Sequence, residues 1–315
     1  MPPWPSGKVF TSLNGVRTIV PLNLGKVEIP GSIPGGGSIF TMIELPEKLR
    51  DELKTVINII REAGEVLLSY QDTNDVKKKE DGTYVTEADH AVSSFIHKNL
   101  ASRFPEYGYV DEELTPSEEE LQKEFCWVID PLDSTRDFVE GRDGFSIIIG
   151  LLHKGKPVLG VAYQPQQEVL YYAVKGEGAY VVRFGKTLKL QVSQDKTLRL
   201  VITRSRKVAA ETTWLREVLH PVSLVRKGGS LKIVDVATGM ATLFLILPVG
   251  VMSVWDLCGT TIILEEAGGT ITDFTGESLN FLTLKHTKGI LASNSIGHEM
   301  LVQKLQDAER NHKEN

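Results

Sequence analysis

The 315-residue sequence predicts an α/β protein in which an α+β half is followed by an α/β half. Three observations predict this fold class. An amphipathic helical pattern lies near residue 50, a group of apolar strand patterns follows in the middle, and strands alternate with helices from about residue 198. Hydrophobic residues make up 41% and charged residues 24%, which excludes a disordered chain or a coiled coil. A boundary near 192–196 divides the chain into expected subdomains 42–195 and 196–315.

The first 41 residues differ from the rest. They are rich in proline and glycine, as in Pro34-Gly35-Gly36-Gly37, and have no helical period. A secretory signal would need a sustained apolar stretch after a basic start, which this segment does not have. A disordered tail and a non-native extension ahead of a true start at Met42 are the two interpretations. The second is favoured because Met42 opens directly onto a helical pattern.

Helices and strands of the first half follow from their apolar spacing. A stripe at three- and four-residue steps predicts a helix over 46–70 (Leu49, Leu53, Val56, Ile57, Ile60, Ala63 and Leu67). Thr86, with Asp89 three residues on, is expected to cap a second helix. Strands are expected at 108–110, 125–129, 145–152, 157–163 and 169–173. The segment 153–156 is expected to join two of these strands as a hairpin loop.

In the second half of the chain, predicted strands alternate with predicted helices. Strands are expected at 198–203, 223–226, 271–273 and 289–292. Helices are expected at 209–219, 230–239, 257–267 and 296–308. Gly268-Gly269 provides a stop for the third of these helices.

Charge and cysteine content limit the function classes. A net charge of −6 does not fit a surface for a nucleic acid polymer, and no apolar run approaches the roughly 18 residues of a membrane span. Two cysteines cannot staple such a chain, so a reducing, cytoplasmic location is expected. The seven histidines lack metal-finger spacing, so any metal is expected to be a hard cation held by oxygen atoms.

The segment Trp127–Thr135 has the clearest chemical signal. A strand delivers Asp130, Pro131 turns the chain, and Asp133 follows. Two carboxylates that converge around a turn repel each other, and Mg²⁺ is their natural partner. The amides after Asp133 and the Thr135 hydroxyl could hold a phosphate. An Asx-Pro turn with Asp133 as a helix cap is the alternative.

Acidic residues mark three further strand ends or helix starts. Asp111-Glu112-Glu113 end a strand, Asp256 precedes a helix, and Asp89 lies at another helix start. A solvated acidic loop is the ordinary explanation for the first group, and helix capping for the other two.

These acids, in this order, show a family resemblance. The chain resembles the inositol monophosphatase superfamily of Mg²⁺-dependent, lithium-sensitive phosphomonoesterases. The resemblance covers about residues 49 to 305 and rests on Asp-Pro-Leu-Asp-Ser-Thr at 130–135, Trp-Asp-Leu-Cys-Gly at 255–259 and Glu-Ala-Gly-Gly at 266–269. It implies a layered αβαβα sandwich of the inositol monophosphatase and sugar phosphatase type, with the site between the halves. Ser134 departs from the usual glycine and puts a side chain where a phosphate is expected to approach.

The resemblance also implies a role for each acid. The implied metal ligands are Glu112, Asp130 as the bridging group, the Leu132 carbonyl oxygen, Asp133 and Asp256. Asp89 would pair with Thr135 to orient and deprotonate the attacking water, and Glu113 would assist. The implied substrate contacts are Ser134, Thr135, Lys232 and Asp256. Lys79 or a neighbour would take the place of a family lysine.

The implied cofactor is Mg²⁺, two or three ions. Two cations would offset the repulsion between hydroxide and a phosphate dianion, lower the pKa of bound water and stabilise the leaving alkoxide. No covalent phosphoenzyme is needed, and Li⁺ is expected to inhibit.

Two features favour a nucleotidase. Gly228-Gly229-Ser230-Leu231-Lys232 resembles the Gly-Ser-Ser-Leu-Lys string of bacterial 3′(2′),5′-bisphosphate nucleotidases, and the Lys232 cation suits a second phosphate. The glutamate that holds sugar hydroxyls in inositol-specific relatives has no counterpart in 247–253, where Val249 and its neighbours are apolar. A solvated helix lysine is the alternative for Lys232.

The expected partner is therefore a small phosphorylated metabolite, first adenosine 3′,5′-bisphosphate. Inositol-1-monophosphatase or fructose-1,6-bisphosphatase activity is the alternative, and a non-catalytic phosphate-binding relative is an alternative of another class. A homodimer is possible, because dimers are frequent in the superfamily.

Overall fold

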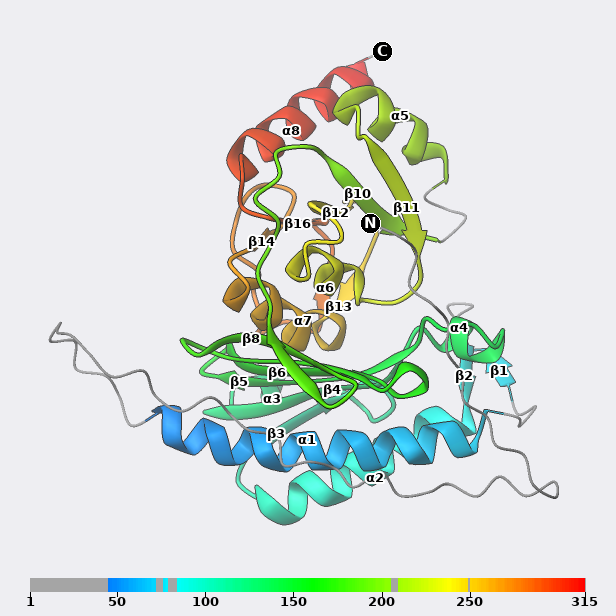
Figure 1. Cartoon of the computed structure of the whole chain (residues 1–315), viewed down its shortest axis with the longest axis vertical. Coiled ribbons are helices and arrows are strands. Elements are labelled where there is room, and N and C mark those ends of the chain that lie inside the picture. The colour runs from blue at the N-terminus through cyan, green and yellow to red at the C-terminus, as the bar shows by residue number, and fades with distance from the viewer. Residues whose placement is uncertain (1–44, 72–75, 79–83, 205–208, 249, 315) are drawn as a thin grey trace, which may run out of the picture. The chain divides into compact units, whose positions relative to one another are not determined.

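The computed structural model describes residues 45–71, 76–78, 84–204, 209–248 and 250–314, which all belong to one compact unit. The expectations for residues 1–41, Met42, Lys79 and Val249 lie outside these ranges. In the described chain the elements stack as helices, sheet, helices, sheet, helices (Figure 1). This confirms the predicted αβαβα fold class.

The first layer contains α1 (Leu45–Ser69) and α2 (Glu87–Arg103). Each residue of the predicted apolar stripe of α1 is at most 3% exposed, because the stripe faces the sheet and α2. A short antiparallel pair, β1 (Val76–Lys78) and β2 (Tyr84–Thr86), leads into α2. Thr86 caps α2 and Asp89 completes the capping box, as predicted.

The second layer is a seven-stranded sheet in the order β3-β4-β5-β6-β7-β8-β9. Its strands are Gly108–Asp111, Phe125–Asp133, Ser146–His153, Lys156–Gln164, Val169–Val174, Gly178–Arg183 and Lys186–Lys189. Only β3 and β4 pair in parallel among these neighbours. The predicted β5–β6 hairpin is present, with Lys154 and Gly155 both at positive φ, as a two-residue turn requires.

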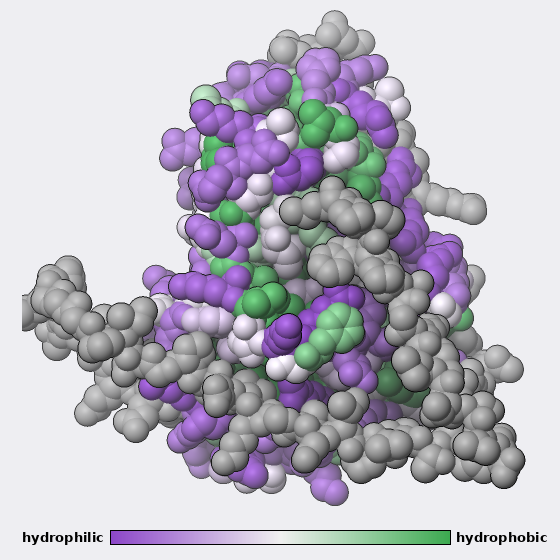
Figure 2. All heavy atoms as spheres, viewed as in Figure 1, coloured by the Kyte–Doolittle hydropathy of each residue, from purple (hydrophilic) through white to green (hydrophobic). Residues whose placement is uncertain are grey.

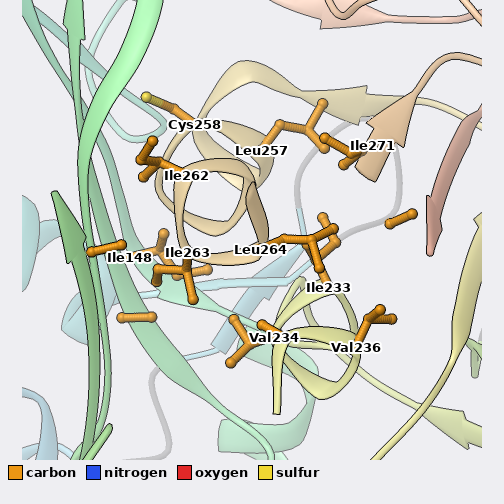
Figure 3. Close-up of a cluster of buried hydrophobic side chains, with 14 of the residues drawn as sticks. Ile148, Ile233, Val234, Val236, Leu257, Cys258, Ile262, Ile263, Leu264 and Ile271 are labelled. Carbon is orange, nitrogen blue, oxygen red and sulfur yellow. The ribbon is translucent and has the colours of Figure 1, made fainter. Parts of the chain in front are cut away.

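The third layer holds α6 (Lys232–Ala237) and α7 (Val254–Glu266) between the two sheets. Almost every residue of both helices is buried, so neither shows an amphipathic face. In Figure 3, Ile262 and Ile263 of α7 lie beside Ile148 of β5, and Leu264 lies beside Ile233 of α6. At the C-terminal end of α7, the Glu266 carboxylate accepts hydrogen bonds of 2.8 Å from the Gly176 and Gly178 amides of the β7–β8 hairpin.

The fourth and fifth layers complete the fold. The sheet has the order β11-β10-β12-β16-β14, with strands Ser223–Lys227, Arg199–Thr203, Leu243–Ile246, Ile290–Ser293 and Thr270–Thr272. The helices α5 (Ala209–Leu219) and α8 (His298–Glu314) cover its outer face. A small pair, β13 (Met252–Ser253) and β15 (Lys285–His286), leads into α7.

Some boundaries differ from those predicted. Strand β4 continues to Asp133 instead of ending at Ile129, and α7 begins at Val254, so Trp255 and Asp256 lie inside its first turn. The sequence prediction also omitted β12, because its apolar residues form a run without alternation. Three short helical turns complete the fold: α3 (Glu118–Leu121), α4 (Thr135–Val139) and η1 (Pro165–Gln167).

The described surface is mostly polar on the side drawn in Figure 2, where hydrophobic residues occur in small groups among hydrophilic ones. Within the described ranges, the helices are all too short or too polar to cross a lipid bilayer.

Candidate active site

The site begins at the end of β4, where the strand leaves its regular pairing. Asp130 pairs with Ile148 and Asp133 with Ser146, and the register shifts between them. The Leu132 amide turns back to donate to the Asp130 carboxylate at 3.1 Å. This irregularity brings Asp130 and Asp133 together, although strand alternation would put residues three apart on opposite faces.

Asp256 joins them from the second half of the chain. One carboxylate oxygen from each of Asp130, Asp133 and Asp256 lies within 4.8 Å of the others. Asp256 is the third residue of α7. Its Oδ2 accepts from the Ser253 amide at 2.7 Å, so Asp256 caps α7, as the ordinary explanation predicted, and also lies in the carboxylate cluster.

Ser230 ties two of these aspartates together. Its amide donates to both oxygens of Asp133, at 2.8 and 2.9 Å, and its hydroxyl donates to Asp256 Oδ1 at 2.8 Å. Ser146 donates to Asp133 from the opposite strand at 3.0 Å. The sequence interpretation did not assign either serine to the site. The position of Ser230 directly after the Gly228-Gly229 pair is the signal that could have identified it.

Asp89 and Thr135 form a second polar group next to the cluster. Asp89 Oδ2 accepts from the amide and hydroxyl of Thr86, both at 2.7 Å, and so caps α2. Its other oxygen accepts from the Thr135 hydroxyl at 3.2 Å, which also lies 3.2 Å from the Leu132 carbonyl oxygen. The pairing of Asp89 with Thr135 is therefore present, 46 residues apart in sequence.

The acidic end of β3 lies beside Asp130. The Glu112 amide donates to the Ile129 carbonyl at 3.2 Å, and the Glu112 charge raises the pKa of Asp130. Asp111 is buried and accepts from Ser93 and from the Glu113 amide, so it stabilises the turn that follows β3. Ordinary solvation of an acidic loop does not describe this segment, because the Glu113 side chain is only 4% exposed.

Burial and mutual repulsion raise the pKa of these carboxyl groups. Burial, then Glu112, Asp133 and Asp256, hold the pKa of Asp130 well above its usual range. Burial and Asp256 raise the pKa of Asp133 to about 6, against the opposing effect of Lys232. The converging ligands are all hard oxygens, and their charges need compensation. The residues present therefore fit a hard divalent cation.

The raised pKa of Asp133 predicts a pH-dependent response to Mg²⁺. A carboxyl group whose pKa is higher folded than unfolded binds more protons when folded. Its stabilising contribution is present below the unfolded pKa, near 3.9, and is lost as pH rises to about 6. Mg²⁺ needs the ionised form, so the rise in melting temperature on adding Mg²⁺ should be small at pH 5 and larger at pH 7.5. Thermal melts with and without Mg²⁺ measure it, and an equal shift at both pH values would contradict it.

Ser134 follows Asp133 in the left-handed region, with φ 68° and ψ 51°. This conformation explains why glycine is usual at this position in the motif that Asp130–Thr135 resembles. The Ser134 hydroxyl donates to Asp137 Oδ2 at 3.0 Å, which offsets part of the strain. Gly229 is also left-handed, and a side chain on it would clash with the Asp133 carboxylate. The backbone thus approaches the site closely at 134 and 229.

The Ser134→Gly variant should fold about as stably as the parent. Glycine removes a left-handed conformational cost of about 1 kcal/mol, and the lost hydrogen bond to Asp137 is worth about the same. Chemical denaturation should give a change within about 1 kcal/mol. Ser134→Ala is the matched control, because it loses the hydrogen bond and keeps the strain, so it should be the less stable of the two.

Lys232 opens α6 and is 4% exposed, so it is not a solvated helix lysine. Its ammonium donates to the Gly229 carbonyl and lies 5.5 Å from the centre of the Phe244 ring. Burial lowers the pKa of Lys232, and the nearby Asp133 and Asp256 charges oppose that effect. The lysine is therefore a counter-charge of the cluster in this structure, and a contact with substrate stays a prediction.

The layered fold and this acidic site define a class of enzymes, the metal-dependent hydrolases of phosphoric monoesters. The inositol monophosphatase family model matches residues 48–310. The chain belongs to the inositol monophosphatase family.

Similar proteins include both nucleotidases and inositol phosphatases. The 3′(2′),5′-bisphosphate nucleotidase CysQ of Aggregatibacter actinomycetemcomitans is 34% identical over 235 residues, which is 73% of this chain and 87% of that protein. Inositol monophosphatase 3 of Solanum lycopersicum is 33% identical over 239 residues, 72% of this chain and 88% of that protein. Among solved structures, the Thermotoga maritima IMPase has a TM-score of 0.71 at 25% identity, covering 83% of this chain and 99% of its own.

Proposed function

We propose that the protein is a Mg²⁺-dependent 3′(2′),5′-bisphosphate nucleotidase that converts adenosine 3′,5′-bisphosphate to AMP and phosphate. The observation that carries this proposal is the similarity to a bisphosphate nucleotidase at 34% identity over 235 residues. The string at 228–232 supports it, because Gly229 lies close to Asp133 and the Ser230 amide donates to Asp133.

The proposed ligands of two or three Mg²⁺ ions are Glu112, Asp130, the Leu132 carbonyl oxygen, Asp133 and Asp256. The ions, when bound, would supply a water of lowered pKa and positive charge at the leaving oxygen. Asp89 would take the proton of the attacking water through Thr135, whose hydroxyl lies 3.2 Å from Asp89 Oδ1. Ser134, Thr135, Lys232 and Asp256 would contact the substrate, and Glu113 would assist at the metal site.

Inositol-1-monophosphatase activity is the second candidate. The similarity to inositol monophosphatase 3 of Solanum lycopersicum, 33% over 239 residues, favours it. The absence of an acid at 247–253 in the sequence opposes it, since a polyol needs a hydrogen-bond acceptor there. Fructose-1,6-bisphosphatase activity belongs to the same group of alternatives.

A direct comparison of kcat/KM decides among these substrates. Adenosine 3′,5′-bisphosphate, inositol 1-phosphate and fructose 1,6-bisphosphate are assayed for phosphate release with Mg²⁺, with EDTA, and with added Li⁺. We expect the nucleotide to be preferred, activity to disappear with EDTA, and Li⁺ to inhibit. A preference for inositol 1-phosphate would overturn the nucleotidase proposal. Binding without phosphate release across the panel would indicate a non-catalytic relative.

The cytoplasmic location and the possible homodimer are also proposals. Cys126 and Cys258 are both buried free thiols, which is consistent with a reducing compartment. Light scattering of the purified protein would measure the oligomeric state.

A further inference from the structure

A group of arginines surrounds one buried carboxylate beside the acidic cluster. The Asp137 side chain is 3% exposed, and its Oδ1 accepts from Arg142 at 3.1 Å and from Arg204 at 2.6 Å. Its other oxygen accepts from the Ser134 hydroxyl at 3.0 Å. Ser134, the residue that follows Asp133 of the acidic cluster, thus contacts the carboxylate that holds two guanidinium groups.

The second half of the chain contributes Arg204 to this position. Arg204 directly follows β10, and its amide donates to the Lys227 carbonyl at the end of β11 at 3.0 Å. Gly228 comes next, and a side chain on it would clash with Asp137 and Ser134. The carboxyl ends of two parallel strands therefore meet Asp137 and Ser134 here, and such strand ends are where α/β proteins bind ligands.

The charges of this group are accessible from solvent. The side chains of Arg142 and Arg204 are 44% and 43% exposed, whereas Lys232 is 4% exposed. Arg136 and Glu140 complete the group as an exposed ion pair at 3.0 Å, and Glu140 also accepts from Arg142. The Arg136 and Glu140 charges offset each other, and the two guanidinium groups on Asp137 exceed its charge by one.

We propose that Arg142 and Arg204 bind the second phosphate of the substrate. Asp137 holds one Nη of each guanidinium, which orients the two planar groups, and the geometry of such forks matches that of a phosphate. A substrate with its reacting phosphate at the acidic cluster would place another anionic group beside Ser134. This inference rests on the proposed function and assigns its specificity for bisphosphates to these two residues.

The test compares a substrate pair that differs by one phosphate. The kcat/KM values for adenosine 3′,5′-bisphosphate and adenosine 3′-monophosphate are measured for the parent, Arg142→Gln and Arg204→Gln. Each variant should lower the bisphosphate value about 10- to 100-fold, the worth of one charge-assisted contact, and change the monophosphate value less than threefold. Arg204→Lys should recover part of the ratio.

The ratio of the two kcat/KM values distinguishes a loss of specificity from structural damage. A variant that merely weakens the fold lowers both values together, and an unchanged ratio in both variants would overturn the inference while leaving the phosphatase intact. Arg136→Gln is the control, because Arg136 is an exposed arginine of α4 that pairs with Glu140 and makes no hydrogen bond to Asp137, so this variant should keep the parent ratio. A parent protein that hydrolyses neither nucleotide would refute the proposed function and this inference with it.

Discussion

The Asp130→Asn variant is expected to lose a factor of about 10³ or more in kcat/KM with Mg²⁺. Asp130 is 1% exposed, and its carboxylate lies within 4.8 Å of ligand atoms of Asp133 and Asp256. Asparagine keeps the size and removes the negative charge that Asp130 would supply as the proposed bridging ligand. The same variant should raise the melting temperature of the metal-free protein, because burial and neighbouring carboxylates disfavour the Asp130 charge and raise its pKa.

A variant of a metal ligand should lower activity and raise the stability of the metal-free protein, whereas a variant of a structural aspartate should lower stability. Asp273→Asn is the matched control: Asp273 is also buried, and it accepts from the Thr275 and Glu277 amides in a turn elsewhere. That variant should lose stability and keep most activity per folded molecule. Phosphate release and thermal melts measure both quantities. Retention of more than a tenth of the activity by Asp130→Asn would contradict a bridging role.

The Asp89→Asn variant is expected to lower kcat by about 10² to 10³ while leaving Mg²⁺ binding nearly unchanged. Asp89 uses one oxygen to cap α2 and the other to accept from Thr135. In asparagine, the capping oxygen can remain and the amide group then faces Thr135. The Thr135 hydroxyl would have to turn to the Leu132 carbonyl, also 3.2 Å away, and would no longer pass a proton to residue 89.

Variants at Thr135 test the same proton path from the other side. Thr135→Ser keeps the hydroxyl and should keep kcat within about tenfold, whereas Thr135→Val removes it and should match Asp89→Asn. The double variant Asp89→Asn, Thr135→Val should be no worse than either alone, because both remove one path. Fully additive losses would show that the two residues act independently.

Most of the fold could be predicted from the sequence where periodicity was clear. The α1 stripe and the β5–β6 hairpin were predicted within about one residue of their boundaries, because each has one buried face or a turn with distinctive residues. Helix α7 was predicted to start three residues late. Val254, Trp255 and Leu257 of its first turn are all buried, so no amphipathic pattern marked where the helix begins.

The site was predictable in composition and not in geometry. The sequence predicted that Asp130 and Asp133 converge around a turn at Pro131, whereas the structure brings them together through a register shift within β4. The approach of Asp256 from the other half of the chain cannot be inferred from local spacing. Ser230 and Asp137 act through contacts across the sequence, 97 and 67 residues from their partners Asp133 and Arg204. Contacts at such separations depend on how the layers stack, which the pattern of a single segment does not contain.

Helix α7 has a consequence for engineering. Its 13 residues span about 20 Å and are fixed at both ends, by Asp256 in the acidic cluster and by Glu266 on the β7–β8 hairpin. The length of α7 therefore sets the distance between its two contacts. Insertions or deletions within it would shift the cluster relative to β4, so changes of loop length are better tolerated elsewhere in this scaffold.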